Sequence, residues 1–225
     1  MDTRSVLEGV QHGTLSVAEA EQYFARKAYE DMGYAKLDTY REIRSGFPEV
    51  VYCPNKPDSY LQAIYQRLFA ENGEVYGTRA TAAQYELVRQ VLPDVVYDHV
   101  GKTLKLEKAD KKYEGLVAVC TAGTADVSVA EEAAQTAEFF GSKVERCYDV
   151  GVSGLHRLLD KVDDLQKANC IVAVAGMEGA LASVIGGLVR SPVIAVPTSV
   201  GYGASFHGVS ALPVSYTHLR AHETR

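Results

Sequence analysis

One unit of sequence pattern occurs four times between Gly115 and Thr198. Each unit has an apolar, β-branched run, then a loop of glycine with serine or threonine, and then a helical pattern. The apolar runs lie at 115–120, 143–150, 170–175 and 193–196. Strands that alternate with helices predict a parallel sheet, because parallel neighbours need a crossover connection. Right-handed crossovers place all four loops at the carboxyl edge of that sheet, where ligands bind.

The composition is that of a globular protein with one large or two small domains in 225 residues. The net charge of −6 gives no support for nucleic-acid binding by bulk attraction. No apolar run reaches the roughly 20 residues that span a bilayer, and the first ten residues lack the apolar centre of a signal peptide. The four cysteines have no CxxC spacing. We therefore expect a cytoplasmic enzyme without disulfides or a metal site.

The N-terminal part predicts two helices and then a small α/β domain. The helices are expected at 2–11 and 16–30, the second with a capping box formed by Ser16 and Glu19. The small domain is expected to have strands from residue 49 and at 74–78 and 95–100, with helices at 59–72 and 81–91. Residues 102–112 predict a β-hairpin arm followed by a linker, with the domain boundary near Lys111. Arg41 and Arg44 are compatible with an anion site or with a solvated face.

The second domain predicts helices at 127–140, 155–168 and 180–189, and the start of a fourth at 203–212. The expected fold is a three-layer α/β/α domain with a parallel sheet. The pair Gly186-Gly187 lies inside the third helix, where each glycine lowers helix stability by about 1 kcal/mol relative to alanine. Glycine at these two positions therefore suggests that the helix backbone comes close to the sheet or to a neighbouring subunit. The expected divisions are 1–36 (helices), 37–111 (small α/β domain), 112–212 (incomplete parallel-sheet domain) and 213–225 (tail).

The tail PVSYTHLRAHETR has no apolar stripe, no cap and no strand pattern. It resembles read-through of adapter or vector sequence, and the alternative is a natural disordered tail. We therefore expect residues 213–225 to be a non-native tail that takes no part in the fold or the function.

The first glycine-rich loop, residues 121–126, joins a strand to a helix. Its backbone N–H groups and the helix dipole favour an anion. Gly123 lets the backbone come close to a ligand, and the hydroxyls of Thr121 and Thr124 can donate to a phosphate. Asp126 could equally be the N-cap of the following helix, which is a structural role.

The third loop reads Gly176-Met177-Glu178-Gly179. A carboxylate at a helix start in a crevice is a candidate acid or base, and the alternative is a favourable N-terminal charge on the helix. The loops GVSG at 151–154 and PTSVGYG at 197–203 complete the rim. His156, one turn into its helix, fits a solvated or packing residue better than a catalytic one.

Several stretches together resemble one family. They are VAVCTAGTAD, YDVGVSGLHRLL, VAVAGMEGALASVIGGLV and SPVIAVPTSVGYGASF, with LDTYREIRSGFPEVVY, Thr78-Arg79 and Tyr97-Asp98 in the first half. The family is the nickel-pincer cofactor carboxylase/hydrolase family, LarB, a distant relative of PurE-type phosphoribosylaminoimidazole (AIR) carboxylase. The resemblance covers about residues 37–212.

The resemblance implies a reaction and a set of site residues. The substrate would be nicotinic acid adenine dinucleotide, with carbon dioxide or bicarbonate as co-substrate and no tightly bound cofactor. The products would be AMP and pyridinium-3,5-biscarboxylic acid mononucleotide. It leaves open whether Mg²⁺ assists pyrophosphate cleavage, and a homo-oligomer is expected. The implied catalytic residues are Glu178 and Asp126, and the implied substrate-binding residues are Thr121, Ala122, Gly123, Thr124, Gly176, Met177, Gly179, Thr198, Ser199, Gly201, Tyr202 and Gly203.

The sequence also departs from the family pattern. The family's reactive cysteine lies in a segment resembling NSCAPG after the last helix, and this sequence has PVSYTHLRAHETR there. We therefore expect the parent protein to be an active carboxylase and this chain as written to lack the nucleophile, with Cys120 an ordinary strand residue. The alternatives are AIR carboxylase or mutase activity, which uses a third-loop histidine where this chain has Gly179-Ala180-Leu181, and a nucleotide-binding module without chemistry.

Overall fold

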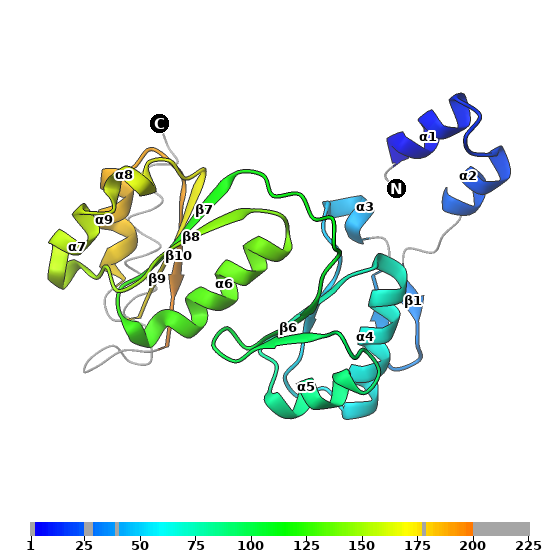
Figure 1. Ribbon diagram of the computed structural model, residues 1–225, viewed down its shortest axis with the longest axis horizontal. Helices are drawn as coiled ribbons and strands as arrows, with labels where there is room; N and C mark the ends of the chain where they lie inside the picture. The colour runs from blue at the N-terminus through cyan, green and yellow to red at the C-terminus, as the bar shows by residue number, and fades with distance from the viewer. Residues whose placement is uncertain (1–2, 25–28, 39–40, 177–178, 200–225) are drawn as a thin grey trace. The chain divides into compact units, whose positions relative to one another are not determined.

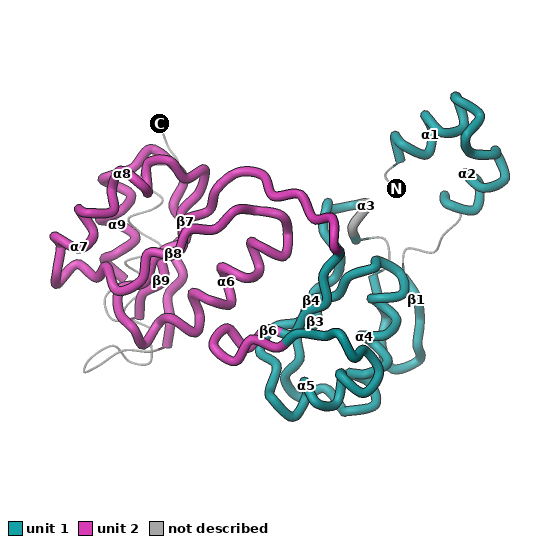
Figure 2. Tube along the Cα trace, viewed as in Figure 1, with its two compact units in different colours: residues 1–96, 104–108 teal, residues 97–103, 109–225 magenta. Residues whose placement is uncertain are grey.

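The computed structural model describes the chain except for residues 1–2, 25–28, 39–40, 177–178 and 200–225. The chain divides into two compact units (Figure 2). Unit 1 comprises Met1–Val96 and Leu104–Lys108, and unit 2 comprises Tyr97–Thr103 and Ala109–Arg225. Among the described residues, no helix is both long and apolar enough to cross a membrane.

The first half of the chain contains short helices and two small sheets. The helices are α1 (Thr3–Gln11), α2 (Val17–Phe24), α3 (Arg41–Ser45), α4 (Asp58–Asn72) and α5 (Ala82–Arg89). The strands are β1 (Glu30–Asp31), β2 (Lys36–Leu37), β3 (Val50–Tyr52), β4 (Val75–Thr78), β5 (Val96–Asp98) and β6 (Thr103–Leu106).

The start of α2 confirms the expected capping box. The Glu19 amide donates to Ser16 Oγ at 3.2 Å, and the Ser16 amide donates to Glu19 Oε2 at 2.7 Å. The expected end of this helix at Glu30 is wrong, because Glu30 pairs with Leu37 in the antiparallel strands β1 and β2. Arg44 forms an ion pair with Asp38 at 2.6 Å, so its charge has a partner in the protein.

The apolar stripe of α4 is confirmed. Its buried residues are Leu61, Ile64, Tyr65 and Leu68, and Gly73 ends the helix in the left-handed conformation with a φ of 70°. The larger sheet has the order β3-β4-β6-β5, in which β3 and β4 are parallel and β4 and β6 are antiparallel. The expected arm is therefore wrong: β6 lies between β4 and β5 inside the sheet, because its alternating residues find partners on both sides.

Unit 2 contains the predicted parallel sheet. Its strands are β7 (Leu116–Thr121), β8 (Lys143–Cys147), β9 (Cys170–Ala175) and β10 (Val193–Pro197). Its helices are α6 (Val127–Phe139), α7 (Leu155–Leu159), α8 (Val162–Leu165) and α9 (Ala180–Leu188), with single 3₁₀ turns η1 (Thr124–Asp126) and η2 (Val152–Gly154). The strand order is β10-β9-β7-β8, and every pair is parallel.

Alternate residues of each strand face two separate cores, which makes the three layers. Cys120 and Ile171 pack with α7, α8 and α9, whereas Val119 and Val174 pack with α6. Figure 1 shows α6 on one side of the sheet and α7 to α9 on the other. The fold class is confirmed: strands buried on both faces read as continuous apolar runs.

Two expectations for the helices of unit 2 are wrong. The helix expected at 155–168 is divided into α7 and α8, and the two pieces bury Leu158 and Leu165 completely. In the part of the chain that the structure describes, no atom outside the α9 backbone lies within 4 Å of a Cβ placed on Gly186 or Gly187. The reason is that α9 packs on the sheet through its other face, which carries Leu181, Ala182 and Ile185. The approach of a neighbouring subunit to this glycine pair stays a prediction. The helix expected at 203–212 lies outside the described residues.

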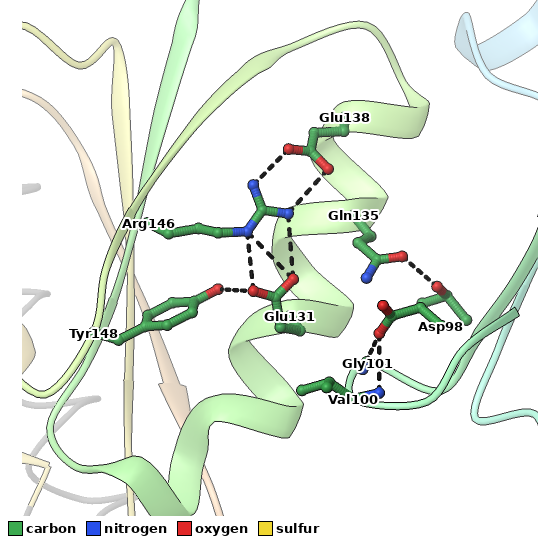
Figure 3. A network of polar contacts seen from close by, with 9 residues as sticks. Asp98, Val100, Gly101, Glu131, Gln135, Glu138, Arg146 and Tyr148 are labelled. Carbon is green, nitrogen blue, oxygen red and sulfur yellow. Dashed lines mark hydrogen bonds and ion pairs between the residues drawn. The ribbon is translucent and has the colours of Figure 1, made fainter.

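Polar contacts fix α6 from two sides (Figure 3). Arg146 on β8 donates to both Glu131 and Glu138 of α6, with Nε to Glu131 Oε1 at 3.0 Å and Nη1 to Glu138 Oε1 at 2.6 Å. The hydroxyl of Tyr148 also donates to Glu131, at 2.7 Å. On the other side, Ser128 donates to the Val100 carbonyl at 2.7 Å. These contacts hold the helix that follows the first loop.

Candidate functional site

The topology of unit 2 creates a crevice between two of its strands. The chain passes from β7 to β8 on one side and then returns to β9 on the other side of β7. Thr121, the last residue of β7, lies opposite Val174 of β9. The loops after β7 and β9 leave toward opposite faces of the sheet, toward α6 and α9. Ligands of open α/β sheets bind outside the carboxyl ends of the strands at such a switch point.

The first loop is held by backbone bonds on both sides. The Ala122 amide donates to the Val174 carbonyl at 3.1 Å, and the Val150 amide donates to the Thr121 carbonyl at 2.9 Å. Thr121 is completely buried, and its Oγ1 accepts a bond from the Asp149 amide at 2.9 Å. In this structure the Thr121 hydroxyl therefore joins the first loop to the second.

The open side of the first loop runs from Gly123 to Ala125. Among the described residues, no atom lies within 4 Å of a Cβ placed on Gly123, and Thr124 and Ala125 are exposed. The single 3₁₀ turn at Thr124–Asp126 then leads directly into α6. The predicted binding residues Gly123 and Thr124 thus lie where a ligand has room, while Thr121 lies beneath them.

Asp126 lies at the N-cap position of α6 but makes no capping bond with its side chain. Its Oδ1 instead accepts a bond of 2.7 Å from the hydroxyl of Thr198, which follows β10. Both residues are buried, with 6% and 5% of their surfaces exposed. Burial raises the pKa of Asp126 above its ordinary value, and bonds from Thr198 and the Gly123 backbone lower it in part. A buried carboxyl with a raised pKa at a crevice is a candidate acid or base.

The structure describes only part of the third and fourth loops. Gly176 and Gly179 are buried, and Gly179 precedes α9 with a φ of 69°, a conformation that favours glycine. The Thr198 amide donates to the Ala175 carbonyl at 3.2 Å, and Ser199 is exposed. Five predicted site residues lie outside the described residues: Met177, Glu178, Gly201, Tyr202 and Gly203. Their roles stay predictions.

The second loop packs directly against the first. A Cβ on Gly151 would lie 2.4 Å from the Ala122 carbonyl oxygen, so only glycine allows this approach. Arg157 of α7 donates to Asp149 at 2.5 Å, and His156 is exposed. Sequence reasoning missed Arg157, a guanidinium beside the loops that suits an anionic ligand. The available signal was that Arg157 comes three residues after Gly154, close to the end of the second glycine-rich loop.

None of the four cysteines combines exposure with a position at the carboxyl edge. Cys120 and Cys147 lie opposite each other on β7 and β8, and both are buried. The Cys147 thiol and burial raise the pKa of Cys120, which keeps it protonated. A thiol in this state is a poor nucleophile, as expected for a strand residue. Within the described part of the chain, no group of three or more His, Cys, Asp or Glu side chains is arranged to hold a metal ion.

Comparisons with known proteins divide the chain at a similar place. Residues 29–108 match the family described as LarB/PurE-like N-terminal domain, and residues 116–216 match AIR carboxylase. An uncharacterised protein of Methanocaldococcus jannaschii is 37% identical over 212 residues, which cover 89% of this chain and 82% of that protein. The N5-carboxyaminoimidazole ribonucleotide mutase of the same organism is 29% identical over 100 residues, which cover 43% of this chain and 59% of the mutase. The family resemblance seen in the sequence motifs is confirmed.

Proposed function

Because the chain belongs to the LarB/PurE-like family and carries a carboxylase-type domain, we propose that its parent enzyme carboxylates the pyridinium ring of nicotinic acid adenine dinucleotide. The same enzyme would cleave the pyrophosphate to release AMP and pyridinium-3,5-biscarboxylic acid mononucleotide. One observation carries the proposal: a LarB-type N-terminal domain and an AIR carboxylase domain occur together in one chain. The similarity to the mutase covers 43% of this chain.

The open loops of unit 2 suit such a substrate. Backbone amides before α6 favour the negative pyrophosphate, because they lie at a helix N-terminus. Thr124 and Ser199 are exposed at this edge and can donate hydroxyl bonds to phosphate oxygens. Arg157 lies beside the second loop as well, where it is paired with Asp149.

The chemistry requires a nucleophile and a base. A thiolate that adds to the electrophilic pyridinium ring gives a neutral, enamine-like ring, and the electron-rich carbon of this ring attacks carbon dioxide to form the new C–C bond. A carboxylate then removes the proton from that carbon and the thiolate leaves, which restores the aromatic pyridinium. Separately, water cleaves the phosphoanhydride. None of the four cysteines of this chain fits the nucleophile, since each is buried or lies away from the carboxyl edge.

Asp126 is the base candidate that the structure describes. Its raised pKa brings the carboxyl closer to neutral pH, which is the condition for efficient proton transfer in both directions. The Thr198 hydroxyl holds one oxygen, so the second oxygen is the one available to a substrate proton. Glu178 is the other candidate, and it lies outside the described residues.

The mutase-like alternative has its own supporting observation, the match of 29% identity to N5-carboxyaminoimidazole ribonucleotide mutase. Against it stands the sequence Gly179-Ala180-Leu181, which lacks the histidine expected in that branch. The LarB-type N-terminal domain at residues 29–108 is a second argument against mutase activity. The match to the mutase covers 43% of this chain, so much of the chain has no counterpart in that match.

The decisive experiment uses the protein encoded by the complete gene. Nicotinic acid adenine dinucleotide and ¹³C-labelled bicarbonate are supplied together, and mass spectrometry follows AMP and the labelled mononucleotide. Labelled product with stoichiometric AMP supports the proposal. Conversion of N5-carboxyaminoimidazole ribonucleotide without reaction of the dinucleotide would support the mutase instead. Saturable dinucleotide binding without turnover would support the non-catalytic module.

A further inference from the structure

We propose that the turn at residues 98–103 positions the candidate base Asp126, because it fixes α6 along the axis of that helix. The turn acts through the backbone of Val100 and Gly101 and through the side chain of Thr103. The proposal rests on the proposed function, in which Asp126 removes the ring proton. It assigns a role in the reaction to a segment outside the four glycine-rich loops.

The turn is part of unit 2. Tyr97–Thr103 belong to this unit, although they lie within residues 29–108, which match the N-terminal family domain. Asp98 closes the turn, since its Oδ1 accepts bonds from the Val100 amide at 3.0 Å and from the Gly101 amide at 2.6 Å. Figure 3 shows both bonds beside α6. They fix the shape of the turn where it contacts the helix.

The backbone of the turn lies directly against the first half of α6. Ser128 Oγ donates to the Val100 carbonyl at 2.7 Å. A Cβ on Gly101 would lie 3.1 Å from the carbonyl carbon of Glu131 and from the backbone nitrogen of Glu132. Positions three and four residues apart share one face of a helix. The turn therefore contacts α6 along one face rather than at a single point.

A buried side-chain contact continues the same face one turn further. Thr103 is completely buried, and Gln135 has 7% of its surface exposed. Thr103 Oγ1 donates to Gln135 Oε1, and the Gln135 amide donates to the Asp98 carboxylate. Figure 3 shows Gln135 pointing from α6 toward the turn. A buried amide that loses its partners destabilises the protein, so these bonds resist a displacement of α6.

The sheet side of α6 resists such a displacement less. Ala130 and Ala134 are completely buried against Val119 and Val174. Methyl groups interdigitate with a sheet less deeply than larger side chains do, so they leave a helix freer to slide. The ion pairs of Arg146 are partly exposed, with 31% of its side chain accessible, and solvent weakens them. The buried bonds of the turn are therefore the main restraint along the helix axis.

The position of α6 determines the position of Asp126. Asp126 directly precedes Val127, the first residue of the helix, and accepts the bond of 2.7 Å from Thr198. A displacement of α6 by about 1 Å would stretch this bond beyond hydrogen-bond range. Misplacement of a catalytic group by about 1 Å can cost roughly 100-fold in rate. The turn thus acts on the reaction through α6, as a positioning element.

The test compares matched variants of the turn. Gly101→Ala suits the backbone, because the φ of Gly101 lies outside the left-handed region, but its methyl group pushes against α6. Thr103→Val removes the donor to Gln135, whereas Thr103→Ser keeps it. His99→Ala is the matched control, because His99 is an exposed residue of the same turn. Circular dichroism checks that each variant is folded.

The first readout is a ¹³C NMR titration of the Asp126 carboxyl in the full chain, which needs no turnover. Burial raises the pKa of Asp126 and the bond from Thr198 lowers it, so a stretched bond should raise the pKa further. We expect this rise in Gly101→Ala and Thr103→Val, and the wild-type pKa in Thr103→Ser and His99→Ala. An Asp126 pKa that is unchanged or lower in both Gly101→Ala and Thr103→Val overturns the proposal.

The second readout is turnover of the dinucleotide by the complete enzyme. In Gly101→Ala and Thr103→Val we expect kcat to fall about tenfold and KM to stay within about twofold. Thr103→Ser should restore kcat. A wild-type kcat in both variants, or a change confined to KM, overturns the positioning role. A wild-type enzyme without turnover would count against the proposed carboxylation alone, because the NMR titration still decides whether the turn positions Asp126.

Discussion

Glycines at the two larger sheets of this protein have different roles. In unit 1, a Cβ on Gly77 of β4 would lie 1.9 Å from the Tyr65 hydroxyl oxygen, so this glycine makes room for a buried ring. In unit 2, no atom of a described residue lies within 4 Å of the Cβ position of Gly123, which is part of the loop that resembles a ligand site. One glycine is required by packing, and the other leaves space for something outside the protein. The residue type alone does not distinguish these uses, but the surroundings of the missing Cβ do.

The largest expected effect concerns Gly77, the glycine that packing requires. Gly77→Ala forces Tyr65 to move, and Tyr65 is completely buried and donates to the Leu104 carbonyl at 3.1 Å. We expect a loss of about 3 kcal/mol in the free energy of unfolding, at the upper end for overpacking. Urea denaturation measures it. Gly123→Ala is the matched control, and a loss there equal to that of Gly77→Ala would contradict the comparison.

The next prediction concerns the chemistry of unit 2. Asp126→Asn removes a proposed proton acceptor, so turnover of the dinucleotide by the complete enzyme should fall about 100-fold or more. The free energy of unfolding of Asp126→Asn should, by contrast, be higher than that of the wild type at neutral pH. Because burial raises the folded-state pKa of Asp126, the ionised carboxylate destabilises the native state above that pKa.

The stability contributed by Asp126 should depend on pH. The stabilising effect of the wild-type carboxyl is present when the group is protonated, and it is lost as the pH rises through the raised folded pKa. The Asn variant should therefore be more stable than the wild type at pH 7, and the difference should disappear at acidic pH. Denaturation midpoints across this range measure it, and a variant that is less stable at pH 7 would argue against a raised pKa.

A smaller effect is expected from the bond that connects the first and fourth loops. Thr198→Val removes the hydroxyl that donates to Asp126 at 2.7 Å, at a cost of about 1 kcal/mol in stability. The bond lowers the pKa of Asp126, so its loss should move the acidic limb of the pH–rate profile upward. Thr198→Ser keeps the donor and should restore the profile. An unchanged profile in Thr198→Val would mean that Thr198 is not a positioning residue for Asp126.

Much of this fold follows from local sequence patterns. Cys170–Ala175 is a strand as expected, since an apolar run between turn signals suits a position buried on both faces. The stripe of α4 follows from its helical period. The position of β6 between β4 and β5 does not follow from local patterns. The neighbours of a strand in a sheet depend on residues elsewhere in the chain.

The candidate site was predictable to a similar degree. The topology of alternating strands and helices places the loops at one edge, and the motif resemblance selects Asp126. The Asp126–Thr198 bond joins residues 72 positions apart, and no local pattern encodes the direction of those side chains. The same limit applies to Gly186 and Gly187, because the sequence shows two small residues on α9 but not which face of the helix meets the sheet.

The smallest expected effect concerns Cys120, the cysteine that lies nearest in sequence to the first loop. Cys120→Ala in the complete enzyme should leave dinucleotide turnover within about twofold, because the buried, protonated thiol is a poor nucleophile. Stability should fall by about 1 kcal/mol, since the change removes one buried atom next to Cys147. Cys170→Ala, a partly exposed strand residue of β9, serves as the control. Turnover that disappears in Cys120→Ala but survives in Cys170→Ala would make Cys120 the nucleophile, and the buried edge of β7 would then have to open during the reaction.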